Sequence, residues 1–278
     1  MTIHYEQRGY VALVTIDRPE RRGAMNNEAY TQLADAWRKV ARTKTVRVAV
    51  ITGVGDSYCS GADLKELIPE VANSARARSA SGESAGDGET QDHRGPDFEG
   101  VPDGSLAVLR GIDFPKPIIA AVNGPCVASG MEMLLGIDIR FASPDAVFGL
   151  PEVCRGLLAR GGSTVRLPRQ VPFAAAMDFL LTGRYVSAHE AERMGLINRV
   201  VDKSELLDTA MATAELIASH SPTAVSATKM SVIEGLKVDM NTAYAIENSY
   251  GDAVFASDDA IEGPKAFLEK RAPQWADA

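Results

Sequence analysis

The sequence has little of what marks several protein classes. Its three cysteines, Cys59, Cys126 and Cys154, are few, odd in number and without metal-ligand spacing, which argues against a disulfide framework or a zinc site. No apolar run nears the roughly 20 residues that a membrane-spanning helix needs. The N-terminus lacks the charged-then-apolar pattern of a signal peptide. These absences predict a protein of the reducing cytoplasm.

Positive charge is also scarce. The 278 residues carry 29 Lys and Arg against 37 Asp and Glu, which gives a net charge of −8. The chain therefore lacks the net positive charge that is typical of proteins that bind nucleic acid or an anionic membrane. A small basic pocket for a phosphorylated ligand stays compatible with that balance. With 45% hydrophobic and 24% charged residues, the composition is that of an ordinary globular protein that can bury a substantial core.

The first two-thirds of the chain alternates strand and helix patterns. Residues 11–17 and 46–52 are rich in β-branched side chains and end at Pro or Gly, which predicts strands. Between them, Asn26 can cap a helix. The apolar residues of that helix recur on one face: Leu33, Ala36, Trp37 and Val40. Further short apolar runs follow up to residue 149, so the sequence predicts a sheet-containing α/β core over residues 1–200.

After about residue 200 the strand patterns stop. Ser221 is a helix cap followed by Pro222 at the first helical position, and helical patterns fill roughly 203–272. Upstream, Ser187 and Glu190 have the spacing of a capping box. Residues 201–278 are therefore predicted to form a helical C-terminal region that packs on another surface.

Residues 70–103 differ from the rest. Ala, Ser, Gly and Asp dominate this segment, whose eight acidic residues outnumber its three arginines. A segment of this composition buries too little apolar surface to offset the conformational entropy that it would lose on folding. A loop of this length is either disordered or a functional lid, and we expect a flexible surface insertion.

Residues 51–67 and residues 116–139 have the same sequence pattern. Each runs from an apolar strand through a Gly-rich turn into the start of a helix. Such a turn leaves backbone N–H groups unpaired at the positive end of a helix. Two turns of this kind, brought together, would form an oxyanion hole.

Two glutamates accompany these turns. Glu132 comes three residues after Ser129, and Glu152 follows Pro151 in an otherwise apolar loop. Each has an alternative structural interpretation, as a buried hydrogen-bond partner for Glu132 and as a loop cap for Glu152. Two carboxylates beside an oxyanion hole, however, can move protons α and β to a carbonyl.

With these motifs the chain resembles the crotonase (enoyl-CoA hydratase/isomerase) superfamily. The match runs from residues 16–26 (IDRPERRGAMN) to 267–275 (FLEKRAPQW), and about residues 70–103 fall outside it. The resemblance implies an α/β fold built as a spiral of ββα units, with a helical C-terminal trimerisation region. It also implies a homo-oligomer, either a trimer or a dimer of trimers.

The resemblance also implies roles for the reacting groups. The N–H groups of Ala62 and Ser129 would form the oxyanion hole for an acyl-CoA thioester. Glu132 would act as general base on water, and Glu152 would deliver a proton to Cα. The pKa of at least one of the two carboxyls is expected to rise toward neutrality through burial and mutual proximity.

For coenzyme A, the resemblance points to residues of the GADLKEL motif and of the C-terminal FLEKR. These substrate-binding candidates are Gly61, Asp63, Lys65, Phe267 and Lys270, of which Lys270 would reach the ligand of a neighbouring subunit. No dinucleotide or Walker-type fingerprint competes with this assignment.

The chain departs from the family pattern at two positions. Ser129 stands where glycine is common, which places a hydroxymethyl group near the thioester. Arg160 stands in a loop that is usually Pro-Gly-rich; it either recognises a polar acyl group or, as we favour from the usual exposure of arginine, points to solvent.

The predicted function is enoyl-CoA hydration, the syn addition of water to a 2-trans-enoyl-CoA, with no metal and no cofactor apart from the coenzyme A of the substrate. Two alternatives within the superfamily are enoyl-CoA isomerisation and dehydration of a polar hydroxyacyl-CoA; the presence of Glu132 favours hydration. An alternative of another class is a non-catalytic acyl-CoA-binding or RNA-binding relative. The net charge and the pair of glutamates count against it.

Overall fold

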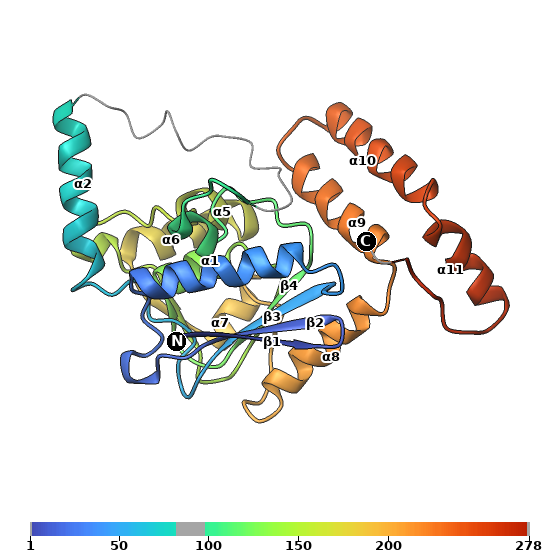
Figure 1. The fold of residues 1–278 in the computed structure, drawn as a ribbon. Helices are drawn as coiled ribbons and strands as arrows, with labels where there is room; N and C mark the ends of the chain where they lie inside the picture. Colours follow the sequence, from blue (N-terminus) through green and yellow to red (C-terminus); the bar gives the residue numbers. More distant parts are fainter. Residues whose placement is uncertain (1, 82–97, 277–278) are drawn as a thin grey trace.

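The computed structural model describes residues 2–81 and 98–276 (Figure 1). Its main sheet has six strands in the order β1-β2-β3-β4-β6-β9. Only β1 is antiparallel to its neighbour, and the other pairs are parallel. The strands span Ile3–Arg8 (β1), Val11–Ile16 (β2), Val48–Gly53 (β3), Ile118–Val122 (β4), Ile139–Ala142 (β6) and Arg199–Val200 (β9).

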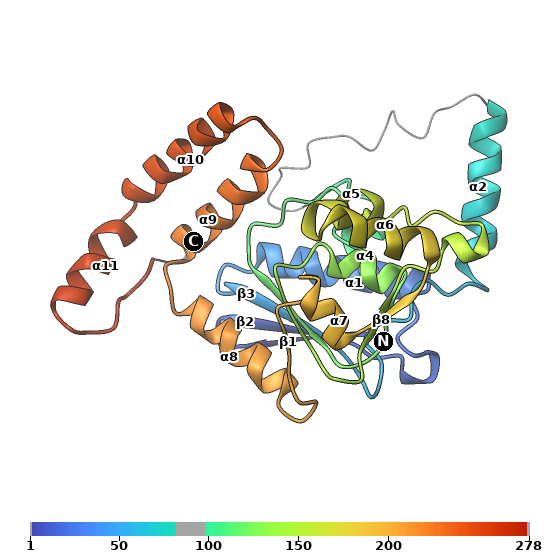
Figure 2. The ribbon, with the colours of Figure 1, turned by 180° about the vertical axis from the view of Figure 1, so that it is seen from behind.

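The central parallel strands are apolar on both faces because helices cover both sides of the sheet. Alternate residues of β4 show this division. Ile118 and Ala120 belong to the core cluster shared with α1 (Asn27–Arg42), whereas Ile119 and Ala121 pack with residues of α8 (Leu206–Ala218). Figures 1 and 2 show α1 and α8 on opposite faces. The predicted α/β core is therefore confirmed.

Helix α1 follows the prediction from its sequence. The Asn26 side chain accepts a hydrogen bond from the Ala29 N–H at 3.0 Å, which satisfies one donor of the first turn. The predicted apolar face is buried, and the Trp37 indole donates to the Ala107 carbonyl at 3.2 Å. That bond joins α1 to α3 (Asp103–Ala107).

A smaller sheet and several short helices complete the core. The three-stranded sheet has the order β5-β7-β8, formed by Cys126–Val127, Val147–Gly149 and Tyr185–Ser187. The helices are α4 (Ser129–Leu134), α5 (Ser163–Gln170), α6 (Phe173–Thr182) and α7 (Ala188–Arg193), with 3-10 turns at Pro19–Arg21 and Val153–Arg155. Ser187 caps α7 as predicted, but the Glu190 carboxylate pairs with Arg184 at 2.7 Å.

The segment predicted as a flexible insertion, residues 70–103, has defined structure at both ends. Helix α2 spans Leu67–Ser81, since this stretch is rich in good helix formers. At the other end, Phe98 is buried and stacks on Phe114 with ring centroids 5.2 Å apart. Asp103 forms an ion pair with Arg38 at 2.8 Å. Residues 82–97 lie outside the described part of the chain.

The C-terminal region consists of helices, as predicted, but they do not form one unit. Helix α8 packs on β2, β3 and β4, so the predicted boundary at residue 201 falls before a helix that belongs to the core. Beyond it, α9 (Pro222–Gly235), α10 (Met240–Phe255) and α11 (Asp259–Leu268) form an arm at the side of the core (Figures 1 and 2). In the described residues, no helix is long and apolar enough to cross a membrane.

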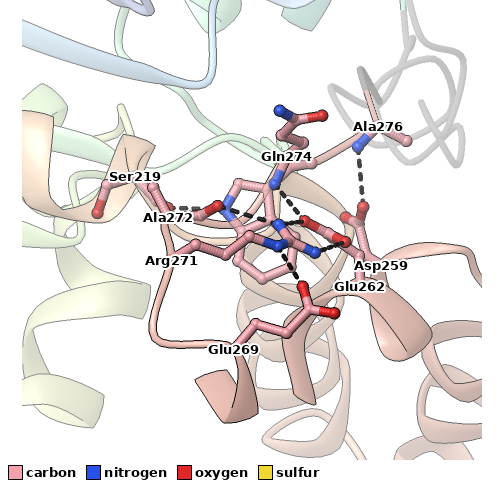
Figure 3. Close-up of polar contacts among 9 residues, drawn as sticks. Ser219, Asp259, Glu262, Glu269, Arg271, Ala272, Gln274 and Ala276 are labelled. Carbon is pink, nitrogen blue, oxygen red and sulfur yellow. Dashed lines mark hydrogen bonds and ion pairs between the residues drawn. The ribbon is translucent and has the colours of Figure 1, made fainter. Parts of the chain in front are cut away.

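Two sets of polar contacts fix the arm. Helix α9 is capped by Ser221, and its Lys229 pairs with Asp138 of the core at 2.7 Å. At the far end, Arg271 forms a two-pronged ion pair with Glu262 at 2.6 and 2.8 Å (Figure 3). The Ala276 N–H also donates to Asp259 at 2.9 Å, which ties the last described residues back to α11.

Candidate active site

The two Gly-rich turns identified in the sequence lie against each other. Cys59 and Cys126 form an isolated parallel bridge, in which the Val127 N–H donates to the Cys59 carbonyl at 2.8 Å. Gly61 has a φ of +104°, and a Cβ at this position would lie 2.8 Å from the Cβ of Ala128. Glycine is therefore required here, both for its backbone conformation and for the close approach of the two turns.

The turns expose one N–H group each beside a shared cavity of about 350 Å³. Met25 donates to the Gly61 carbonyl and accepts from the Asp63 N–H, both at 2.8 Å, so the intervening Ala62 N–H points away from Met25. Ser129 begins α4, where helix geometry leaves the N–H without an internal partner. Neither N–H donates a hydrogen bond to any other described residue.

The residue before Ser129 has an unusual backbone. Ala128 has a φ of +50° and a ψ of −117°, a conformation that side-chain-bearing residues rarely adopt. Its N–H donates to the Gly149 carbonyl at 2.9 Å. A strained residue held by neighbouring contacts at the mouth of a helix is typical of functional sites.

Glu132 lies one turn inside α4 on the wall of the cavity. Its side chain is buried, and Oε1 accepts a hydrogen bond from the Gly161 N–H at 2.6 Å. Burial raises the pKa of the Glu132 carboxyl, and the Gly161 hydrogen bond opposes that rise. A Cβ at Gly161 would overlap the Glu132 carboxylate, so a larger residue here would displace that side chain.

Glu152 lies on the wall of the same cavity. Its Oε2 atom is buried and has no hydrogen-bond partner in the described part of the chain. Burial raises the pKa of the Glu152 carboxyl to about 7, and the nearby charge of Glu132 contributes. The side chain makes no capping bond to the 3-10 turn that follows, so the alternative of a loop cap is wrong. A carboxyl that titrates near neutrality and has one unpartnered oxygen is suited to exchanging a proton with a bound molecule.

The hydroxyl of Ser129 is fixed by a residue that sequence reasoning missed. The Tyr30 hydroxyl donates to Ser129 Oγ at 2.7 Å, and burial raises the pKa of Tyr30. Tyr30 lies on α1, 99 positions earlier in the chain. Gly161 was missed as well, although the Gly161-Gly162 pair after Arg160 was a usable signal for close backbone approach.

None of the five proposed coenzyme residues is among the described residues that line the cavity. Gly61 and Asp63 flank Ala62, whereas Lys65 is exposed and does not line the cavity. Phe267 is 83% exposed near the end of α11, and Lys270 follows that helix; both lie on the arm, away from the cavity of their own chain (Figure 1). No group of three or more potential metal ligands occurs among the residues that the structure describes.

Comparisons with known proteins find relatives over nearly the whole chain. Residues 6–85 and 102–278 match the enoyl-CoA hydratase/isomerase family. The enoyl-CoA hydratase EchA19 of Mycobacterium tuberculosis is 40% identical over 97% of this chain and 94% of its own length. The (E)-benzylidenesuccinyl-CoA hydratase of Thauera aromatica is 36% identical over 98% of each chain. A crystal structure of an enoyl-CoA hydratase from M. tuberculosis H37Rv has a TM-score of 0.82 and 36% identity, covering 100% of this chain and 99% of that one.

Proposed function

The chain belongs to the enoyl-CoA hydratase/isomerase family, and we propose that it is an enoyl-CoA hydratase that adds water syn across the double bond of a 2-trans-enoyl-CoA. The observation that carries this proposal is the convergence of Glu132, Glu152 and the turns at Ala62 and Ser129 on one cavity.

The N–H groups of Ala62 and Ser129 serve as the oxyanion hole. Both are left without partners among the described residues, so they are available to donate to the thioester oxygen. Addition of water at Cβ places negative charge on that oxygen as an enolate forms. One preorganised donor of this kind is typically worth about 3–4 kcal/mol in the transition state.

The two carboxyls divide the proton transfers. The hydrogen bond from the Gly161 N–H favours the ionised form of Glu132, which suits a general base that takes a proton from water. Glu152, with a pKa of about 7, holds a proton in much of the population near neutral pH and delivers it to Cα. The water molecule supplies the hydroxyl group at Cβ, so one C–O and one C–H bond form as the double bond is lost.

Dehydration of a hydroxyacyl-CoA is the reverse of this reaction and uses the same groups with their roles exchanged. Isomerisation of a double bond needs only one proton-transfer group beside the oxyanion hole, and the second carboxyl at Glu132 therefore favours hydration. A non-catalytic binding protein would have no need of two carboxyls with raised pKa values in one cavity.

The test is the hydration of crotonyl-CoA by the Glu132→Gln and Glu152→Gln variants. Each substitution keeps the shape of the side chain and removes one proton-transfer role, so kcat is expected to fall on the order of 10²-fold or more. Circular dichroism should stay native. Near-wild-type kcat in either variant would refute the acid–base assignment, and an inactive but RNA-binding wild type would favour the non-catalytic alternative.

The coenzyme moiety is proposed to bind along Gly61, Asp63 and Lys65, with Phe267 and Lys270 supplied by a neighbouring copy in a trimer or a dimer of trimers. Large apolar side chains are exposed on the arm, which supports its role in assembly: Val232, Leu236, Met240, Tyr244, Phe255, Ile261, Phe267 and Leu268. We further propose that the reaction needs no metal or redox cofactor and takes place in the cytoplasm.

A further inference from the structure

The cavity beside the two glutamates continues into a second hollow. This hollow has a volume of about 500 Å³ and is lined by residues of α1, of α3 and of the loop before α5. Ala62, Glu132, Arg160 and Gly161 lie on the walls of both. An acyl chain whose reacting carbons lie at Glu132 therefore has the second hollow within reach of its remaining atoms.

The second hollow is lined by two arginines and two acidic residues. Arg110 and Arg160 lie on its wall, together with Asp103 and Glu132. Asp103 is already engaged by Arg38 at 2.8 Å and by the Thr31 hydroxyl at 2.8 Å. The Glu132 carboxyl accepts a hydrogen bond from the Gly161 N–H at 2.6 Å and is one of the two proposed proton-transfer groups.

Arg160 is an exposed residue, as favoured from the sequence, and directly precedes Gly161, whose N–H donates to Glu132. Its charge is near enough to Glu132 to oppose the rise in that carboxyl's pKa. In the ranges 2–81 and 98–276 it forms no ion pair. A guanidinium presents several N–H donors in a planar fork that matches the two oxygens of a carboxylate.

A second polar group lies at the junction of the two hollows. Ser129 lines the first cavity and Tyr30 the second. Because Ser129 Oγ accepts from the Tyr30 hydroxyl at 2.7 Å, the Ser129 proton is directed elsewhere, and no other described residue accepts it. A hydroxyl held in this way can donate to an oxygen atom of a molecule in the cavity.

We propose that the substrate is a 2-enoyl-CoA whose acyl chain carries a carboxylate, which Arg160 binds in the second hollow while the Tyr30–Ser129 pair donates to a substrate oxygen. This assignment rests on the proposed hydratase function and adds the substrate class to it. Arg160 is thereby a specificity-determining residue, and Tyr30 acts through Ser129 as a positioning residue.

The experiment compares kcat/KM for two substrates, crotonyl-CoA and 4-carboxybut-2-enoyl-CoA, which differ by one carboxyl group on C4. Wild-type protein should prefer the carboxylated substrate by tenfold or more. Arg160→Gln should reduce the ratio of the two kcat/KM values by about 10- to 100-fold, mainly through KM, since a hydrogen bond to a charged group contributes about 1.5–3 kcal/mol. The matched control is Arg169→Gln, which removes one positive charge from an exposed residue of α5 outside both hollows and should leave the ratio unchanged.

Tyr30→Phe tests the positioning role. It should raise KM for the carboxylated substrate and leave the far-ultraviolet circular dichroism native, because only one hydroxyl is lost.

A wild-type preference for crotonyl-CoA, or an Arg160→Gln ratio equal to that of the wild type, would overturn the inference while leaving the hydratase function intact. Wild-type protein that hydrates neither substrate would instead refute the proposed function, and this inference with it.

Discussion

Glu152 is expected to lower the stability of the protein at neutral and alkaline pH while it serves catalysis. The pKa of its carboxyl is raised from 4.5 to about 7 by burial, so the folded state holds a proton that the unfolded state has released between these two values. Stability then falls as pH rises through that window, because the folded state binds more protons than the unfolded state. The isosteric Glu152→Gln variant has no charge to bury and escapes this loss.

The magnitude follows from the same numbers. Moving the pKa of a carboxyl from 4.5 to about 7 corresponds to about 3.4 kcal/mol at 1.36 kcal/mol per pH unit. Since Glu152 is only partly buried, solvent screening reduces this to roughly 1–2 kcal/mol. For a protein of this size, each kcal/mol moves the midpoint of thermal unfolding by about 2–4 °C.

The assay is thermal unfolding of wild type and Glu152→Gln at fixed protein concentration, between pH 4.5 and pH 8.5. The variant should unfold about 2–8 °C higher than the wild type at pH 8 and near the same temperature at pH 4.5. The matched control is Glu190→Gln. The half-buried Glu190 carboxyl has a pKa lowered by its bond to Arg184, so that variant should not gain stability as pH rises. The assignment of a buried, protonated Glu152 would be refuted if Glu152→Gln unfolded at a lower temperature than the wild type at pH 8. It would also be refuted if the difference between the two unfolding midpoints did not change with pH.

Two further perturbations probe the site and the arm. Gly161→Ala places a methyl group where it overlaps the Glu132 carboxylate and should lower kcat by about 10- to 100-fold through loss of the hydrogen bond to Glu132; steady-state kinetics on crotonyl-CoA measures this, and unchanged kcat would show that the contact is not needed. Lys270→Ala should raise KM for acyl-CoA more than it lowers kcat, because it removes a phosphate contact remote from the reacting carbons; an equal rise in KM for a truncated pantetheine thioester would contradict that role. Light scattering should give the mass of a trimer or a larger assembly, and a stable monomer at micromolar concentration would remove the basis for the shared site.

Local patterns in the sequence predicted much of the fold. The β-branched runs became β2 and β3, and the caps at Asn26 and Ser221 begin α1 and α9 as expected. These features depend on interactions between residues a few positions apart, which periodicity and capping describe well. The insertion was judged on composition alone, and α2 shows that a segment of low hydrophobicity still forms a helix where its residues favour one.

The candidate glutamates and turns were also visible in the sequence, but their relation to one another was not. Only the tertiary structure places the turn at Gly61 against Ala128, brings Tyr30 to Ser129 and sets the Gly161 N–H on Glu132. The last two contacts join residues 99 and 29 positions apart, and no local pattern encodes such a distance. The raised pKa of Glu152 has the same origin, since burial is a property of all the elements that surround a side chain and not of its neighbours along the chain.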